Sequence, residues 1–168
     1  HLLGGVKYKE FLDGNKIKIF EYKSKVSNNI KKSFVENILD LSKYNNVILV
    51  YPYPEISFSP PKKITDKYFL ENKSVKKILE EQYLYEPYKN YLEHSKKAFE
   101  LLNSIKSDNV YRVFPHTLFC NTIMKYNCVT HDDRNIFYSD ENHLSLKGAE
   151  MINDLIMKEI EKIELKSN

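Results

Sequence analysis

The clearest hydrophobic pattern in this chain is an unbroken apolar run from Val47 to Tyr51. Such a run is typical of a strand that is buried on both faces of a parallel sheet. A second strand is predicted at 109–114, where apolar and polar residues alternate until Pro115. A short and partly exposed strand is predicted at 17–22, because lysines alternate there with apolar residues. Asp13-Gly14-Asn15, just before it, is a turn signal.

Helical periodicity occupies the segments between and after these strands. A capping-box signature that starts at Ser33 predicts a helix to about Tyr44. Two more helices are predicted at 75–85 and 88–105, on either side of Pro87. The last predicted helix follows Ser145, its N-cap, and has apolar residues at helical spacing: Ala149, Ile152, Leu155, Ile156, Ile160 and Ile163.

This alternation of strands and helices predicts an α/β fold, organised as an α/β/α sandwich with a mostly parallel sheet. The length of 168 residues suits one domain over 1–168 with a sizeable core. Gly148 is expected to let the last helix approach the sheet closely.

The segment 52–61 is predicted to be a loop because it contains four prolines. In open α/β sheets, loops that leave the carboxyl ends of strands line the ligand crevice. Three side chains in the loop are therefore candidate substrate contacts: Tyr53, Glu55 and Phe58. A rigid connection that only packs is the alternative. Ser57 and Ser59 are poor candidates for a nucleophile, since neither lies on a glycine-flanked turn between strand and helix.

Composition narrows the range of functions. The net charge is only +3, and the lysines are spread along the chain, so nucleic-acid binding is not indicated. No apolar run approaches the roughly 20 residues that span a bilayer. The N-terminus also lacks a signal-peptide pattern. Any segment that exports or attaches the protein is therefore expected outside this sequence.

The strongest chemical signal is Asp140 placed three residues before His143, at the start of the last predicted helix. A carboxylate that orients an imidazole is half of the machinery that activates a serine hydroxyl. The spacing alone more often belongs to a capping carboxylate beside a solvated histidine. His116 follows a predicted strand end and is a candidate crevice residue. His131-Asp132-Asp133 suggests a metal site, but such a polar loop is more often solvated, and it completes no recognised zinc pattern.

The residues around this pair favour the chemical interpretation. Tyr138-Ser139-Asp140-Glu141-Asn142-His143-Leu144-Ser145-Leu146-Lys147-Gly148-Ala149 resembles the last block of the SGNH hydrolase superfamily. More narrowly, it is similar to the SGNH domains fused to membrane-embedded acyltransferase-3 proteins. The segment 47–55, with its strand and Pro-x-Pro-Glu loop, and the two cysteines Cys120 and Cys128 fit the same group. The resemblance implies that His143 is the general base and Asp140 its partner.

The family also opens with a Gly-Asp-Ser block that supplies the nucleophile, and this sequence contains no such block. Either the chain is the C-terminal part of a longer protein or the domain has lost its nucleophile, and we expect the former. The missing block would remove the N-terminal strand of an SGNH-like, flavodoxin-type sheet. An exposed edge, or a segment from another chain, would then take its place.

The residues alone leave Cys120 and Cys128 as either buried thiols or a short-loop disulfide. The resemblance favours a disulfide, because the related domains face an oxidising compartment. It also implies O-acetylation of a cell-envelope glycan at the periplasmic or extracytoplasmic face, with an acyl donor and a membrane acyltransferase domain in the same polypeptide. No cofactor or metal is implied. The alternatives are a carbohydrate esterase of the same fold and a non-catalytic glycan-binding domain.

Overall fold

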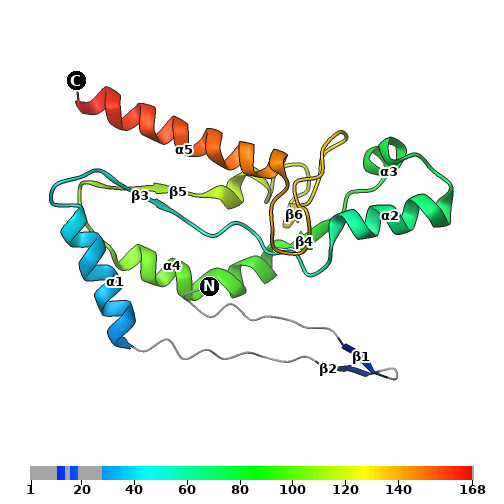
Figure 1. Ribbon diagram of the computed structural model, residues 1–168, viewed down its shortest axis with the longest axis horizontal. Helices are drawn as coiled ribbons and strands as arrows, with labels where there is room; N and C mark the ends of the chain where they lie inside the picture. Colours follow the sequence, from blue (N-terminus) through cyan, green and yellow to red (C-terminus); the bar gives the residue numbers. More distant parts are fainter. Residues whose placement is uncertain (1–10, 14–15, 19–27, 168) are drawn as a thin grey trace. The chain divides into compact units, whose positions relative to one another are not determined.

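The computed structural model of the chain describes residues 11–13, 16–18 and 28–167 (Figure 1). The chain divides into two compact units. The first comprises His1–Val47 and Glu93–Val110, and the second comprises Ile48–Leu92 and Tyr111–Asn168. All of the candidate site residues belong to the second unit.

The first unit contains a short hairpin. Strands β1 (Phe11–Asp13) and β2 (Lys16–Lys18) pair in the antiparallel sense, with Asp13 opposite Lys16. The turn signal at Asp13-Gly14-Asn15 lies between these strands in the sequence, and residues 14–15 are outside the described part. The start of the strand predicted at 17–22 is confirmed, and residues 19–22 lie outside the described part.

Helix α1 (Asn28–Leu41) also belongs to the first unit. It begins five residues before Ser33, so Ser33 lies inside the helix and the capping-box prediction is wrong. None of its residues is fully buried, and Leu41 is exposed. After the helix, the side-chain amide of Asn109 donates to the carbonyl of the buried Ser42 at 2.9 Å.

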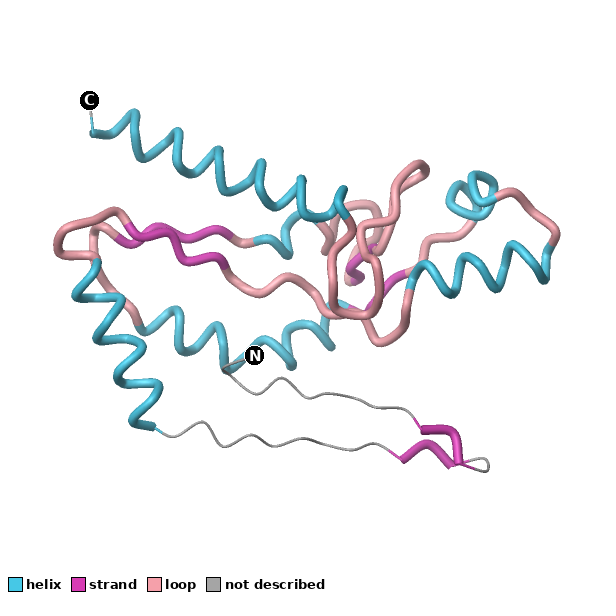
Figure 2. Tube along the Cα trace, in the orientation of Figure 1, coloured by secondary structure: helices cyan, strands magenta, loops and turns pink. Residues whose placement is uncertain are grey.

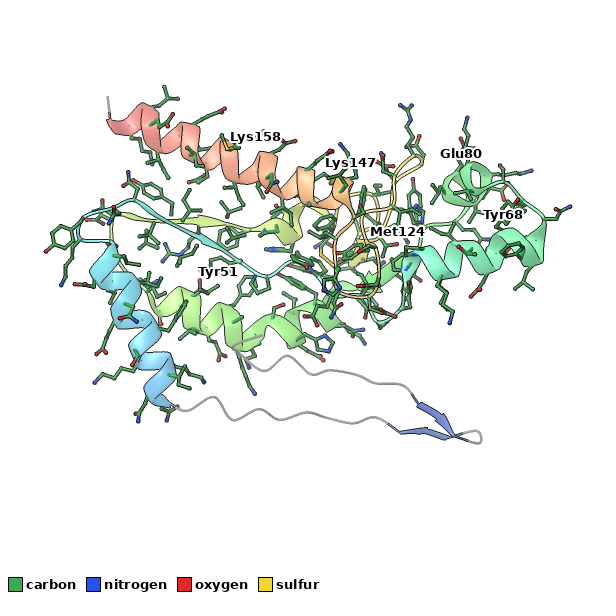
Figure 3. All side chains as sticks on the ribbon, in the orientation of Figure 1. Tyr51, Tyr68, Glu80, Met124, Lys147 and Lys158 are labelled. Atoms are coloured by element: carbon green, nitrogen blue, oxygen red, sulfur yellow. A yellow bond between two sulfur atoms is a disulfide. The ribbon has the colours of Figure 1, made fainter. Side chains whose placement is uncertain are left out.

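Strands β3 (Val47–Val50) and β5 (Val110–Val113) confirm the strand predictions for 47–51 and 109–114 and pair with each other. The amide of Val47 donates to the Asn109 carbonyl, and the amide of Tyr51 donates to the Val113 carbonyl, at 2.8 and 2.9 Å. Both partners advance together along the sequence, so the strands run parallel. Burial on both faces is confirmed only in part, because Leu49 is buried whereas Val50 is exposed. Tyr51, labelled in Figure 3, is buried and packs against Phe114.

In the second unit, helix α2 (Pro60–Glu71) was not predicted, because its two prolines indicated a loop. Pro60 and Pro61 occupy its first two positions, where a missing amide hydrogen costs nothing. Helix α3 (Val75–Glu81) is capped by Ser74, whose hydroxyl accepts from the Lys77 amide. The two helices share a small apolar core: Ile64, Ile78 and Leu79, with Leu84 and Ile136 packed against them.

The helix predicted at 75–85 ends early, because Tyr85–Pro87 is strand β4. This strand pairs in the antiparallel sense with β6 (Asn127–Val129), a strand that was not predicted. Helix α4 (Tyr88–Ser104) confirms the prediction for 88–105. A 3-10 turn, η1 (Pro115–Leu118), follows β5, and the long helix α5 (Leu146–Ser167) ends the chain.

The α/β class is confirmed, whereas the three-layer sandwich is confirmed only in part. Among the described residues the strands form three two-stranded sheets, of which β3–β5 is parallel (Figure 2). None of the described helices combines the length and the hydrophobicity needed to cross a membrane.

Candidate functional site

The candidate site lies at the start of α5, whose first turn is fixed by two residues. The hydroxyl of Ser145 accepts from the Gly148 amide at 3.2 Å and donates to the Ile136 carbonyl at 2.6 Å. Ser145 is therefore the N-cap, as predicted. A Cβ atom at Gly148 would lie 2.2 Å from the Phe137 carbonyl oxygen, so glycine is required where the helix meets that segment.

A tight turn, residues 139–143, immediately precedes this helix. An antiparallel bridge between Tyr138 and Leu144 closes the turn, and the Ser139 amide donates to the His143 carbonyl at 2.9 Å. Inside it, Asp140 Oδ1 accepts from the amides of Asn142 and His143 at 2.9 and 2.8 Å. This is the Asx-type turn that aspartate favours, since its carboxylate satisfies amides two and three residues ahead.

The other carboxylate oxygen of Asp140 faces the imidazole of His143. The distance from Asp140 Oδ2 to His143 Nδ1 is 2.7 Å. The His143 side chain is 72% exposed and that of Asp140 is 41% exposed, so the rest of the ring is open to solvent. The Asn142 amide, then the His143 imidazole and the His143 amide, hold the pKa of Asp140 below its ordinary value. An ionised carboxylate therefore meets Nδ1, as base orientation requires.

The proline-rich segment 52–59 contacts this turn. The Tyr53 hydroxyl donates to the Asn142 carbonyl, and the Ile56 amide donates to the Glu141 carbonyl, both at 2.8 Å. The Tyr138 hydroxyl in turn donates to the Pro54 carbonyl at 2.9 Å. Burial, with the negative charges of Glu55 and Asp140, raises the pKa of Tyr53.

The other predicted contact residues have different surroundings. Glu55 is exposed. Phe58 lies under the Lys63 ammonium group, which is 5.7 Å from its ring centroid. His116 stacks on Tyr91 with a centroid separation of 5.3 Å, and burial lowers its pKa. Tyr53 is therefore the predicted residue that a hydrogen bond connects to the turn, and substrate contact remains a prediction for all four.

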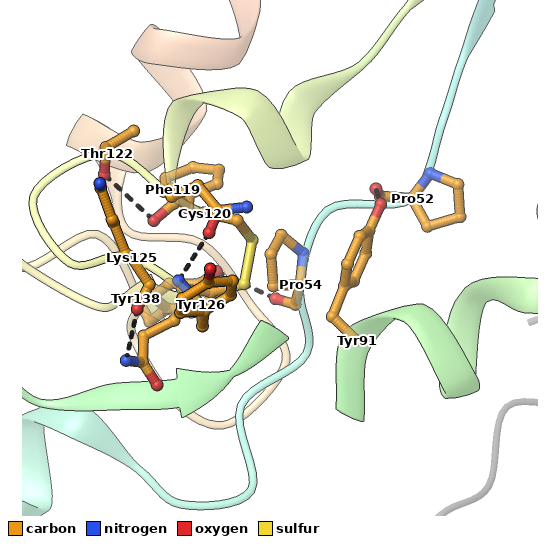
Figure 4. Close-up of a disulfide and its surroundings, with 12 residues drawn as sticks. Pro52, Pro54, Tyr91, Phe119, Cys120, Thr122, Lys125, Tyr126 and Tyr138 are labelled. Atoms are coloured by element: carbon orange, nitrogen blue, oxygen red, sulfur yellow. Dashed lines mark hydrogen bonds between the residues drawn. A yellow bond between two sulfur atoms is a disulfide. The ribbon is translucent and has the colours of Figure 1, made fainter. Parts of the chain in front are cut away.

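Cys120 and Cys128 form the disulfide that the resemblance implied (Figure 4). Next to it, the Val129 amide donates to the Phe119 carbonyl at 2.9 Å, which ties β6 to the η1 segment. Phe119, beside Cys120, packs against Phe137 and Tyr138, which lead into the turn 139–143, with ring centroids 5.7 and 5.8 Å apart. The disulfide region therefore contacts the segment before the turn, and the segment 52–59 contacts the turn itself.

Ser57 is not a free hydroxyl. Its amide and its hydroxyl both donate to Glu86 Oε2, at 3.0 and 2.6 Å, and Asn90 donates to Glu86 Oε1 at 2.5 Å. Glu86 is only 3% exposed, so these donors satisfy a buried carboxylate. The Ser57 hydroxyl is therefore engaged by Glu86, which supports the view that Ser57 is a poor candidate for the nucleophile.

His131 is fully buried, so the expectation of a solvated loop is wrong for this residue, whereas Asp133 is exposed. The Leu84 amide donates to its Nε2 at 3.0 Å, and its Nδ1 lies 2.8 Å from the Asp132 carbonyl oxygen. Both ring nitrogens of His131 are thus hydrogen-bonding partners of backbone groups. In the described parts of the chain, no group of three or more His, Cys, Asp or Glu residues could hold a metal ion.

Sequence reasoning missed three residues that shape the site. Asn142 and Ile56 act through backbone groups, which leave no signal in side-chain identity. Glu86 lies 29 residues from Ser57 in a segment without a motif. For Asn142, the turn-forming run Ser139-Asp140-Glu141-Asn142 was a usable signal.

Comparison with known proteins identifies the family. The family described as SGNH domain (fused to AT3 domains) matches residues 5–158. Comparisons with curated proteins and with solved structures gave no match. The match includes the Asp140–His143 turn, the segment 52–59 and the disulfide. The chain therefore belongs to the SGNH domain family that is found fused to AT3 domains.

Proposed function

We propose that this chain carries the acid–base half of a serine acyl-transfer site, which O-acetylates a glycan of the cell envelope. The observation that supports the proposal is the 2.7 Å contact between Asp140 Oδ2 and His143 Nδ1, on an imidazole that is 72% exposed. A carboxylate on Nδ1 directs Nε2 toward a reacting hydroxyl. Membership of the SGNH family supplies the acyltransferase or esterase class.

In this mechanism, His143 Nε2 takes the proton of a serine hydroxyl as its oxygen attacks the acyl carbonyl. The protonated imidazole, stabilised by Asp140, then gives that proton to the departing group and leaves an acyl-serine. The serine is not identified in these 168 residues, because the sequence has no Gly-Asp-Ser block.

The second half repeats these steps with a new acceptor. A sugar hydroxyl loses its proton to His143 and attacks the acyl-serine, which returns the serine and forms the sugar ester. A membrane acyltransferase domain of the same polypeptide would deliver the acyl group, consistent with the fusions known for the family. The Cys120–Cys128 disulfide favours an extracytoplasmic location. We further propose that β3 and β5 belong to a wider parallel sheet in an α/β/α sandwich.

The test uses the product of the complete reading frame that encodes this chain. The protein is given an acetyl donor and an envelope oligosaccharide, and acetyl groups on the sugar and acetate in solution are both measured. We expect acetylated sugar from the unaltered protein and almost none from His143→Ala. Lys147→Ala, at an exposed position on the first turn of α5, is the control and should stay active.

The distribution of products separates the alternatives. Acetate without sugar ester, still dependent on His143, would identify an esterase. Sugar binding without either product would identify a glycan-binding domain. Equal sugar acetylation by His143→Ala would contradict the proposed role of the pair.

A further inference from the structure

Two of the three peptide groups between Asp140 and His143, Glu141–Asn142 and Asn142–His143, are held at both ends. In the first, the Glu141 carbonyl accepts from the Ile56 amide at 2.8 Å, while the Asn142 amide donates to Asp140 Oδ1 at 2.9 Å. In the second, the Asn142 carbonyl accepts from the Tyr53 hydroxyl at 2.8 Å, while the His143 amide donates to Asp140 Oδ1, also at 2.8 Å.

Two hydrogen-bonded chains therefore start in the segment 52–59 and converge on one carboxylate oxygen. Each chain passes through a planar peptide group, so polarisation at the carbonyl strengthens the amide donor on its other side. Asp140 Oδ1 is thereby fixed, and because the carboxylate is rigid, Oδ2 is fixed as well. Oδ2 is the atom that faces His143 Nδ1.

The segment that supplies these donors is itself anchored. The Tyr91 hydroxyl donates to the Pro52 carbonyl at 2.8 Å, and the Tyr138 hydroxyl donates to the Pro54 carbonyl at 2.9 Å (Figure 4). At the far end, Ser57 is held by the buried carboxylate of Glu86. Pro52 and Pro54 also fix their own φ angles. The segment is therefore a stable reference for the more exposed turn.

We propose that Tyr53 is a positioning residue: its hydroxyl, acting through the Asn142–His143 peptide group, orients the carboxylate that orients His143. This inference rests on the proposed function for its catalytic consequence, although the geometry stands without it. Substrate contact stays a separate prediction for Tyr53, whose hydroxyl hydrogen is already donated within the protein. The raised pKa of Tyr53 keeps that hydrogen in place at neutral pH.

The structure offers a closely matched control. Tyr53→Phe and Tyr91→Phe each remove one hydroxyl that donates to a backbone carbonyl at 2.8 Å. The Tyr53 hydroxyl bonds to the turn 139–143, whereas this bond of the Tyr91 hydroxyl goes to Pro52 in the segment 52–59. If the hydroxyls merely stabilise the fold, both variants should behave alike.

The experiment has two readouts on the full-length protein. In acyl transfer, Tyr53→Phe should lower kcat about tenfold and leave KM unchanged, since one hydrogen bond is lost that acts on the base and not on substrate. In protein labelled with 15N-histidine, the Nδ1 proton shared with Asp140 should give an NMR signal that broadens in Tyr53→Phe. Tyr91→Phe should retain both kcat and the signal.

The outcomes separate this inference from the proposed function. An unchanged signal and kcat in Tyr53→Phe, equal losses in both variants, or a rise in KM alone would overturn the positioning role. If the unaltered protein transfers no acyl group, the proposed function fails and the signal decides. Broadening in Tyr53→Phe alone would then still support Tyr53 as the residue that orients the pair.

Discussion

Two loops of the second unit each place a histidine near an aspartate, but one histidine is buried and the other is exposed. His131 adjoins Asp132, and His143 follows Asp140. His131 is fully buried, whereas His143 is 72% exposed. Each histidine has an aspartate within three residues in the sequence, so the presence of a nearby aspartate does not distinguish the two loops.

The partners of the ring nitrogens explain the difference. Both nitrogens of His131 face backbone groups, of Leu84 and Asp132, and its ring stacks on Tyr83 at 5.5 Å. His143 has a side-chain carboxylate on Nδ1, and the remainder of the ring faces solvent. Only the second arrangement leaves a nitrogen for a substrate or a nucleophile.

The two carboxylates differ in the same way. Asp132 Oδ1 accepts from the amides of Arg134 and Asn135, and the Asn135 side chain contacts both of its carboxylate oxygens. Asp140 uses Oδ1 for two backbone amides and Oδ2 for His143. The Asp140 carboxylate therefore contacts the ring of His143, whereas the hydrogen bonds of the His131 ring go to backbone groups. The first arrangement is the one that suits a general base.

The largest expected effect is on activity. His143→Ala should reduce acyl transfer by about 10⁴-fold or more, as loss of the general base usually does. Because the side chain is exposed, the free energy of unfolding should change by no more than about 0.5 kcal/mol. Rate measurements and urea unfolding check both values. If His143→Ala were destabilised but still active, His143 would be a structural residue like His131, which would contradict the comparison.

His131→Ala should show the reverse pattern. It removes a buried ring and leaves the Leu84 amide without its acceptor, so unfolding should become easier by about 2–5 kcal/mol. Urea unfolding at a temperature where the variant stays folded measures this, together with the rate per folded molecule. A large loss of rate in fully folded protein would show that His131 is also part of the site.

Gly148→Ala tests the segment that both loops share. The Phe137 amide donates to the Thr130 carbonyl beside His131, and the Phe137 carbonyl accepts from Ser145 beside His143. A Cβ at Gly148 would displace that carbonyl, at a cost of about 1–3 kcal/mol. Thermal unfolding should show the loss, and histidine NMR signals of both loops should shift. A shift confined to one loop would show that they are independent.

The smallest effect concerns pH. Burial alone would raise the pKa of Asp132, but the amides of Arg134 and Asn135 outweigh it, so the pKa of Asp132, like that of Asp140, lies below the ordinary 3.8. A carboxyl with a depressed folded-state pKa contributes stability above its unfolded pKa, and that stability is lost as pH falls through the folded value. Both groups should therefore still be mostly ionised at pH 3.8 and become protonated only as the pH falls further.

Carboxylate 13C NMR measures these titrations. His143→Ala should raise the pKa of Asp140, because the imidazole is one cause of its depression, and should leave that of Asp132 unchanged. An Asp140 midpoint at or above 3.8, or one that does not respond to His143→Ala, would contradict the described contact.

The sequence predicted the features that depend on side-chain pattern. The apolar run in β3, the alternation in β5, the stripe of α5 and the Asp140–His143 spacing were each visible and are confirmed as structure. The Ser145 cap follows from the same local chemistry. Such features depend on residues only a few positions apart.

Features that depend on distant partners were missed. Helix α2 was concealed because Pro60-Pro61 suits a helix start as well as a loop. The burial of His131 depends on Leu84, 47 residues away, and the fixing of Asp140 depends on backbone groups held by Tyr53 and Ile56. Backbone donors have no residue signature, so periodicity and motif spacing carry no information about them.

The central claim is that His143, held by Asp140, activates a serine. A fluorophosphonate probe tests it most directly, since it attaches covalently to serine hydroxyls that a general base has activated. With the product of the complete reading frame, we predict labelling of one serine that falls at least about 100-fold in rate in His143→Ala and is unchanged in Lys147→Ala. Equal labelling rates in the unaltered protein and in folded His143→Ala would contradict the account.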